Sequence, residues 1–177
     1  MNGDALAFGS SAYLRMMALL LLGRGADFFS TWVATPNLVL EGNPLARKLG
    51  WKLGALVNLA LCLGLAFWPT TAWAAATASL LVAAHNFHLA WLMRSMGEDA
   101  FRHWFLERMA ESRLPIFLTC LLGETGATGL VGAALLYYYR YQEDSMAFAI
   151  GCGIVAYAFI VLFYTLLSLW RRRRNQG

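Results

Sequence analysis

The sequence predicts an all-α integral membrane protein, a single domain with five transmembrane helices and one amphipathic helix. The 177 residues are 59% hydrophobic and only 14% charged, with a mean hydropathy of +0.53, whereas soluble domains are about 25% charged. The apolar residues gather in stretches of about 20, which is the length that crosses a bilayer. The basic residues flank these stretches and form no basic-aromatic stripe, so nucleic acid is not an expected partner.

Five spans are expected, and each has its own reason. The first is the most polar, because Arg24 and Asp27 interrupt it. The second is expected to end at Pro69, since proline does not continue a helix. The fourth carries Gly123, Gly126, Gly129 and Gly132, which we expect to let a neighbouring helix approach closely. The expected ranges are about 14–34, 51–69, 72–93, 115–137 and 147–170.

The connection between the third and fourth spans predicts a further helix over about residues 98–112. Its apolar residues recur at roughly helical spacing, and charged residues fill the other positions. Such a pattern is typical of an amphipathic helix that lies on the membrane surface, and a helix that docks a partner is the alternative. The apolar residues are Phe101, Trp104, Phe105, Leu106 and Met109.

The basic residues predict the orientation of the chain in the membrane. Eleven of the 14 Lys and Arg residues lie on one side if the chain crosses five times. The positive-inside rule places that side in the cytoplasm, so we expect the N-terminus outside and the C-terminus inside. These residues are Arg47, Lys48, Lys52, Arg94, Arg102, Arg108, Arg113 and Arg171 to Arg174.

Polar residues inside four of the spans fall at a similar depth. With a rise of 1.5 Å per residue, Asp27, Asn58, His85 and His88, and Glu124 each lie roughly 9–13 Å from the inner end of their span. Intramembrane polar residues are costly and usually face the interior of a bundle. We therefore expect them to converge in the inner half of the bilayer, with Arg24 pairing with Asp27 one turn away on the same face as Thr31.

The segment after the first span is expected to fold back towards this polar layer. Thr35-Pro36 ends the helix, and Asn43 and Pro44 suit the cap and first turn of the next one. The residues between them are too apolar for a free loop. Folding back would bring Glu41 towards Asp27 and the histidines.

The same stretch resembles a known family. The pattern D-x-x-S-T followed by E-x-N-P-L-x-R is similar to that of small bacterial and archaeal membrane proteins of unknown function. The match covers roughly residues 22–66, and the residues "TPNLVLEGNP" replace the family's usual glycine-rich approach to the glutamate. The resemblance implies a helical bundle with a polar motif at one membrane face, and no particular reaction. The matching residues are Asp27, Thr31, Glu41, Asn43, Pro44 and Arg47.

Two classes of function remain open from these residues. In the first, Asp27, Glu41 and Glu124 act in catalysis or proton transfer, or His85, His88, Asp27 and Glu124 bind a divalent metal, in a membrane enzyme or a small transporter. In the second, the chain is an accessory or assembly subunit, and the polar residues only join helices. A haem or chlorin on His85 or His88 is a weaker alternative, since a histidine near aromatic residues has many causes. The expected partners are the lipid bilayer and a homo-oligomer or larger membrane complex.

Overall fold

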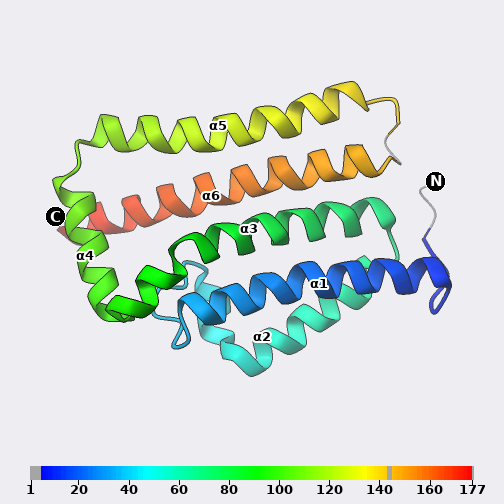
Figure 1. The fold of residues 1–177 in the computed structure, drawn as a ribbon, viewed down its shortest axis with the longest axis horizontal. Coiled ribbons are helices and arrows are strands. Elements are labelled where there is room, and N and C mark those ends of the chain that lie inside the picture. Colours follow the sequence, from blue (N-terminus) through cyan, green and yellow to red (C-terminus); the bar gives the residue numbers. More distant parts are fainter. Residues whose placement is uncertain (1–4, 143–144, 177) are drawn as a thin grey trace.

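The computed structural model describes residues 5–142 and 145–176, and every regular element in these residues is a helix. Four of the long helices run side by side, α2 lies obliquely against α1, and α4 crosses the molecule at one end (Figure 1). The all-α prediction is therefore confirmed. The helices are α1 (Ser11–Ala34), α2 (Pro44–Leu65), α3 (Pro69–Met96), α4 (Glu98–Glu111), α5 (Leu114–Tyr138) and α6 (Met146–Gln176).

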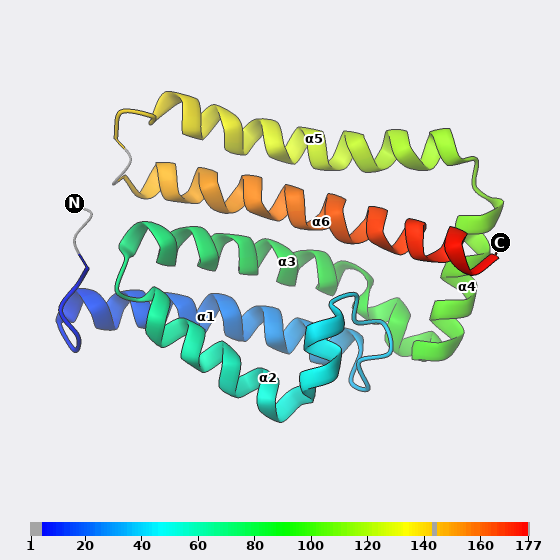
Figure 2. The ribbon, with the colours of Figure 1, turned by 180° about the vertical axis from the view of Figure 1, so that it is seen from behind.

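The long helices form a row rather than a closed bundle. In order across the molecule, α5 packs on α6, α6 on α3 and α3 on α1, while α2 packs on α1 and the edge of α3 (Figures 1 and 2). Successive long helices run in opposite directions. The ends of α1, α3 and α6 therefore lie near α4, together with the beginnings of α2 and α5. We call this the α4 end of the molecule.

Three of the described helices, α2, α5 and α6, are long and apolar enough to cross a membrane by their length and composition. The sequence predicts five spans, and the other two fall on α1 and α3. These helices have 24 and 28 residues, which is sufficient length. Their apolar character is lower because α1 contains Arg24 and Asp27, and α3 contains two histidines and an asparagine.

The second helix begins and ends earlier than the expected span of 51–69, but its start at Asn43 and Pro44 is the one that the sequence predicts. Asn43 caps α2, because its Oδ1 accepts a hydrogen bond of 3.0 Å from the Leu45 N–H, and Pro44 is the first helical residue. The helix is kinked at Gly50, whose φ of 65° is left-handed. Pro69 opens α3 instead of ending α2. Proline suits a first helical position because the N–H that it lacks would have no partner there.

Small residues allow the helices to approach closely at three of the contacts, namely α1 with α3, α6 with α3, and α5 with α6 at Gly132. A Cβ on Gly23 of α1 would lie 2.9 Å from the Ala76 Cα of α3. A Cβ on Gly153 of α6 would lie 2.5 Å from the Ala74 carbonyl oxygen of α3. On α5 the prediction is only partly right, because Cβ atoms on Gly123 and Gly126 would meet nothing within 4 Å.

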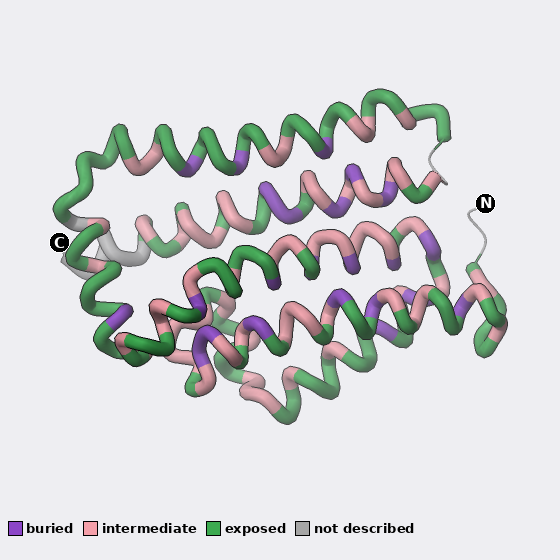
Figure 3. The backbone as a smooth tube through the Cα atoms, in the orientation of Figure 1, coloured by how far each residue is buried: buried purple, intermediate pink, exposed green. Residues whose placement is uncertain are grey.

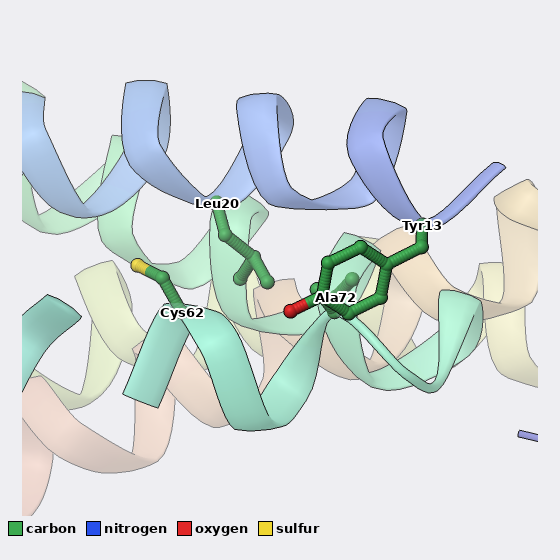
Figure 4. Packing of buried hydrophobic residues seen from close by; sticks show 5 residues of the cluster. Tyr13, Leu20, Cys62 and Ala72 are labelled. Carbon is green, nitrogen blue, oxygen red and sulfur yellow. The ribbon is translucent and has the colours of Figure 1, made fainter. Parts of the chain in front are cut away.

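The apolar core lies at the end of the molecule opposite α4. Tyr13 and Leu20 of α1, Cys62 and Ala66 near the end of α2, and Ala72 of α3 are buried there (Figures 3 and 4). The Tyr13 hydroxyl donates to the Leu63 carbonyl over 3.1 Å, so the polar end of this buried ring has a partner. Packing thus fixes one end of α1, α2 and α3, and leaves the polar residues at the other.

The helix α4 has the bounds that the sequence predicts, but its apolar residues are covered unequally. Phe101 is buried, at 4% exposure, and packs against the rings of Trp104 and Phe105. Both of those rings are exposed, at 39% and 41%. The apolar side of α4 is therefore only partly covered by the rest of the chain.

Candidate functional site

A cleft of about 510 Å³ lies in the α4 half of the molecule. Its walls come from α1, the first half of α2, the second half of α3 and the middle of α6, and the loop of residues 35–43 forms part of its lining. Figure 2 shows this loop and the start of α2 lying over α1 and α3 at that end. Asp27, Glu41 and His85 line the cleft together, although they come from three separate segments. Asp27 and His85, together with Asn58, show the convergence expected from depth, and Glu41 reaches the cleft on the folded-back loop.

Arg24 joins three helices at the floor of this region. Its Nε lies 2.8 Å from Asn58 Oδ1 of α2, and its Nη2 donates to the same oxygen. Its Nη1 lies 3.1 Å from Asp27 Oδ2 and 3.2 Å from Ser79 Oγ of α3. The expected ion pair is therefore present, with side-chain exposures of 30% for Arg24 and 19% for Asp27. The guanidinium group is surrounded by acceptors, which reduces the cost of its burial.

A second polar contact joins α1 to α3 one turn further along. The Asn86 side-chain amide donates to Ser30 Oγ and to Thr31 Oγ1, both over 3.2 Å. Ser30 Oγ also donates to the Asp27 carbonyl oxygen over 2.8 Å. Thr31 and Asn86 both line the cleft, so they hold two of its walls together. Polar contacts of this kind are typical of helix pairs inside membranes.

Glu98 holds the 35–43 loop in place. Its carboxylate accepts hydrogen bonds from Thr35 Oγ1 at 2.5 Å, from the Asn37 N–H at 2.9 Å and from the Asn37 side-chain amide at 3.0 Å. It also accepts one from the Val39 N–H at 3.1 Å. Four donors of one loop thus converge on a carboxylate at the first turn of α4. The sequence analysis missed Glu98, because its partners are set by the conformation of the loop.

These contacts favour the ionised form of Glu98. Burial acts to raise the pKa of its carboxyl group, but the hydrogen bonds from Thr35, Asn37 and Val39 act in the opposite direction and outweigh it. The pKa of Glu98 is therefore below its ordinary value. Its position in the first turn of α4 also favours the negative charge, since the helix dipole is positive there.

The loop is further fixed by contacts within the chain. Leu40 N–H donates to Thr35 Oγ1 over 3.1 Å, and Leu38 has a left-handed φ of 57°. Asn43 N–H donates to Glu41 Oε1 over 2.7 Å. Trp51 Nε1 of α2 donates to the Pro36 carbonyl oxygen over 2.8 Å. The segment folds back as the sequence predicts, and Glu41 reaches the cleft that Asp27 lines.

His85 and Glu124 form a separate pair. His85 Nδ1 of α3 lies 3.7 Å from Glu124 Oε1 of α5, with side-chain exposures of 46% and 52%. His85 lines the cleft, and Glu124 does not. His88 is exposed and lies outside the cleft, so its expected convergence is wrong. Arg47, the last residue of the E-x-N-P-L-x-R pattern, is also exposed and does not line the cleft.

The four candidate metal ligands are not brought together. His85 contacts Glu124, Asp27 contacts Arg24, and His88 lies apart. Among the residues that the structure describes, no three of His, Cys, Asp and Glu lie where they could hold one metal ion. The described residues therefore include no group of side chains that would support the predicted metal site.

Aromatic residues also line the cleft. Trp51 packs edge-on against Phe28 with ring centroids 4.9 Å apart. Tyr157 and Tyr164 come from α6 at a spacing of seven residues, which places them on one helical face. That spacing was the signal that could have found them, but apolar helices contain many such pairs.

No protein-family model, curated protein or solved structure matches the chain.

Proposed function

We propose that this protein is a small carrier of a prokaryotic inner membrane, and that its cleft holds a solute in the inner half of the bilayer. The observation that carries the proposal is the cleft of about 510 Å³ in which Asp27, Glu41 and His85 meet. Its volume is within the range of small-molecule sites, about 300–1,000 Å³. Ionisable residues at membrane depth typically mark the path of a substrate or a proton.

The proposal includes five spans, with α1 and α3 counted beside α2, α5 and α6. The polar residues of α1 and α3 contact one another and line the cleft, so they need not face lipid. Eleven of the 14 basic residues belong to segments at the α4 end. The positive-inside rule then places the α4 end in the cytoplasm and the N-terminus outside. The helix α4 would lie along the inner surface, with Trp104 and Phe105 towards lipid.

Transport has more support than metal-dependent catalysis. The carboxylates and histidines do not form a metal-binding group among the described residues. Asp27, Glu41 and the His85–Glu124 pair can instead exchange protons or bind a charged solute without a metal. A carrier of five spans would be small, so we expect it to work as an oligomer.

The alternative function is an accessory or assembly subunit. It is favoured by one observation: within the described residues, every buried side-chain nitrogen and oxygen has a hydrogen-bond partner. The Arg24 contacts would then only join α1, α2 and α3. The cleft argues against this alternative, because a purely structural polar core needs no cavity.

The experiment that tests the proposal measures access to the cleft from each side of the membrane. Thr165 lines the cleft from α6 and is replaced by cysteine in a variant whose native Cys62, Cys120 and Cys152 are alanine. The matched control is Leu130→Cys on α5, a side chain 71% exposed on the apolar surface. Both are treated with a charged, membrane-impermeant thiol reagent in inside-out and right-side-out vesicles.

A carrier predicts that Thr165→Cys reacts from the α4 side and also, more slowly, from the other side, because its site alternates between them. Leu130→Cys is expected to stay unreacted, since lipid covers it. Reaction from one side only would overturn transport and leave a one-sided binding site. Absence of reaction from both sides would remove the cleft as a water-accessible site and favour the accessory subunit.

A further inference from the structure

The charged groups of the cleft are predominantly acidic. Asp27 and Glu41 line it, and Glu124 lies 3.7 Å from the His85 nitrogen at its edge. Arg24 is the one Lys or Arg among the described residues that line it. The Arg24 guanidinium already donates to Asn58, Asp27 and Ser79. An anionic solute would therefore be repelled by the carboxylates and would find no free basic side chain in the lining. A cationic solute would find carboxylates that are not all neutralised by basic residues.

Of the two carboxylates that line the cleft, Glu41 is the better candidate to bind a cation. Its Oε1 accepts only the Asn43 N–H among the described contacts, and no Lys or Arg is paired with it in the described residues. It is carried by the loop that Glu98 fixes, so its position does not depend on its own charge. A carboxylate held in this way at the edge of a cleft is suited to a charged hydrogen bond with an ammonium group.

The walls beside these carboxylates are aromatic. Phe28 and Trp51 come from α1 and α2, and Tyr157 and Tyr164 come from α6. Aromatic faces attract ammonium groups through their quadrupole, most strongly where water is excluded. They also provide apolar area for a hydrocarbon portion of the same ligand. The combination of carboxylates and aromatic rings therefore favours a ligand that carries both a positive charge and a hydrocarbon portion.

We propose that the cleft binds a compact organic ammonium ion, with its nitrogen between Asp27 and Glu41 and its apolar portion against the rings. This inference rests on the proposed role of the cleft as a solute site. Exposed basic residues such as Arg47, Lys48 and Lys52 lie on α2 outside the lining. They could attract anions to this end of the molecule, so the test must compare charges directly.

The experiment uses three probes of one shape, namely 3-phenylpropylammonium, 3-phenylpropanol and 3-phenylpropanoate. Binding to the full chain in nanodiscs is measured by calorimetry, with empty nanodiscs subtracted for partition into lipid. The ammonium ion is expected to bind at least about tenfold more tightly than the alcohol, as one charge-assisted contact would give. The carboxylate is expected to bind more weakly than the alcohol.

Variants identify the groups responsible. Glu41→Gln and Asp27→Asn are each expected to abolish the preference for the ammonium ion over the alcohol. Gln keeps the acceptor for the Asn43 N–H, and Asn keeps one for Arg24. Glu111→Gln is the matched control, because Glu111 is an exposed carboxylate on α4 outside the cleft, paired with Arg108. It is expected to keep the preference unchanged.

Tighter binding of 3-phenylpropanoate, or equal binding of all three probes, would overturn the ammonium inference and leave the cleft as a solute site. Loss of the preference in Glu111→Gln would also overturn it, since the preference would then depend on a carboxylate outside the cleft. If no probe binds while Thr165→Cys still reacts with the water-soluble reagent from both sides of the membrane, the ligand class is wrong and the carrier proposal stands. If no probe binds and Thr165→Cys does not react, both proposals fail.

Discussion

At the scale of single residues, the molecule depends on a few side chains that each contact several segments. Arg24 joins α1 to α2 and α3, and Glu98 joins α4 to the 35–43 loop. Sequence reasoning could find the Arg24–Asp27 pair because a spacing of three residues places both on one helical face. It could not find Glu98, whose partners lie about 60 residues away.

The lowered pKa of Glu98 leads to a prediction about pH. A carboxyl group with a lower pKa in the folded state stabilises that state above its unfolded pKa, and the stabilisation is lost as the pH falls through the folded value. Glu98→Gln is expected to lower stability at pH 7 by about 1–2 kcal/mol, a discounted value because the group is half-exposed. The difference between variant and parent should shrink below pH 4.5, the ordinary value for this group.

Thermal unfolding in detergent at pH 7, 5 and 3.5 measures this difference. Glu111→Gln serves as the control on the same helix, since Glu111 contacts Arg108 at the surface and contributes little. A difference of the same size at pH 3.5 and pH 7 would show that the charge of Glu98 is not what holds the loop.

At the scale of helices, the sequence predicts well which segments are helical and how far along each helix a polar residue lies. It predicts less well towards which side of the helix that residue points. The rise of 1.5 Å per residue fixes how deep each polar group lies, so Asp27, Asn58 and His85 reach one cleft. The angle around the helix is less certain. His85 and His88 are three residues apart, which leaves them about 60° apart on the helix. In a row of helices with one side open, that angle is enough to put His85 in the cleft and His88 outside it.

The close contact of α3 and α6 leads to a prediction about Gly153. A Cβ at this position would lie 2.5 Å from the Ala74 carbonyl oxygen and 2.7 Å from Thr77 Cβ. Gly153→Ala therefore forces the two helices apart and is expected to lower stability by about 1–3 kcal/mol. Because α6 carries Tyr157 and Tyr164, the same shift should also weaken any ligand of the cleft.

Gly126→Ala on α5 is the matched control for the Gly153 variant. A Cβ there meets nothing within 4 Å, and alanine is the better helix former. It is expected to leave the melting temperature in detergent unchanged or slightly raised. Equal stability of Gly153→Ala and the parent would mean that α3 and α6, neighbours in Figure 1, are not as close in the membrane as the Gly153–Ala74 contact indicates.

At the scale of the whole molecule, the open question is the number of spans. Three described helices are long and apolar enough to cross a membrane, and the proposal adds α1 and α3. The two arrangements differ in the ends of α3. If α3 crosses the membrane, Trp68 and Gly97 lie on opposite sides, and if only α2, α5 and α6 cross, both lie on the same side.

Single cysteines at Trp68 and Gly97, in a variant whose native cysteines are alanine, distinguish the two arrangements. Five spans with the α4 end inside predict that an impermeant thiol reagent modifies Trp68→Cys in right-side-out vesicles and Gly97→Cys in inside-out vesicles. The physical reason is the positive-inside rule, since Arg94, Arg102, Arg108 and Arg113 flank the Gly97 end. Modification of both from one side would contradict five spans. It would also place His85 of α3 outside the bilayer, where its ionisation costs little and its polar character would need no function to explain it.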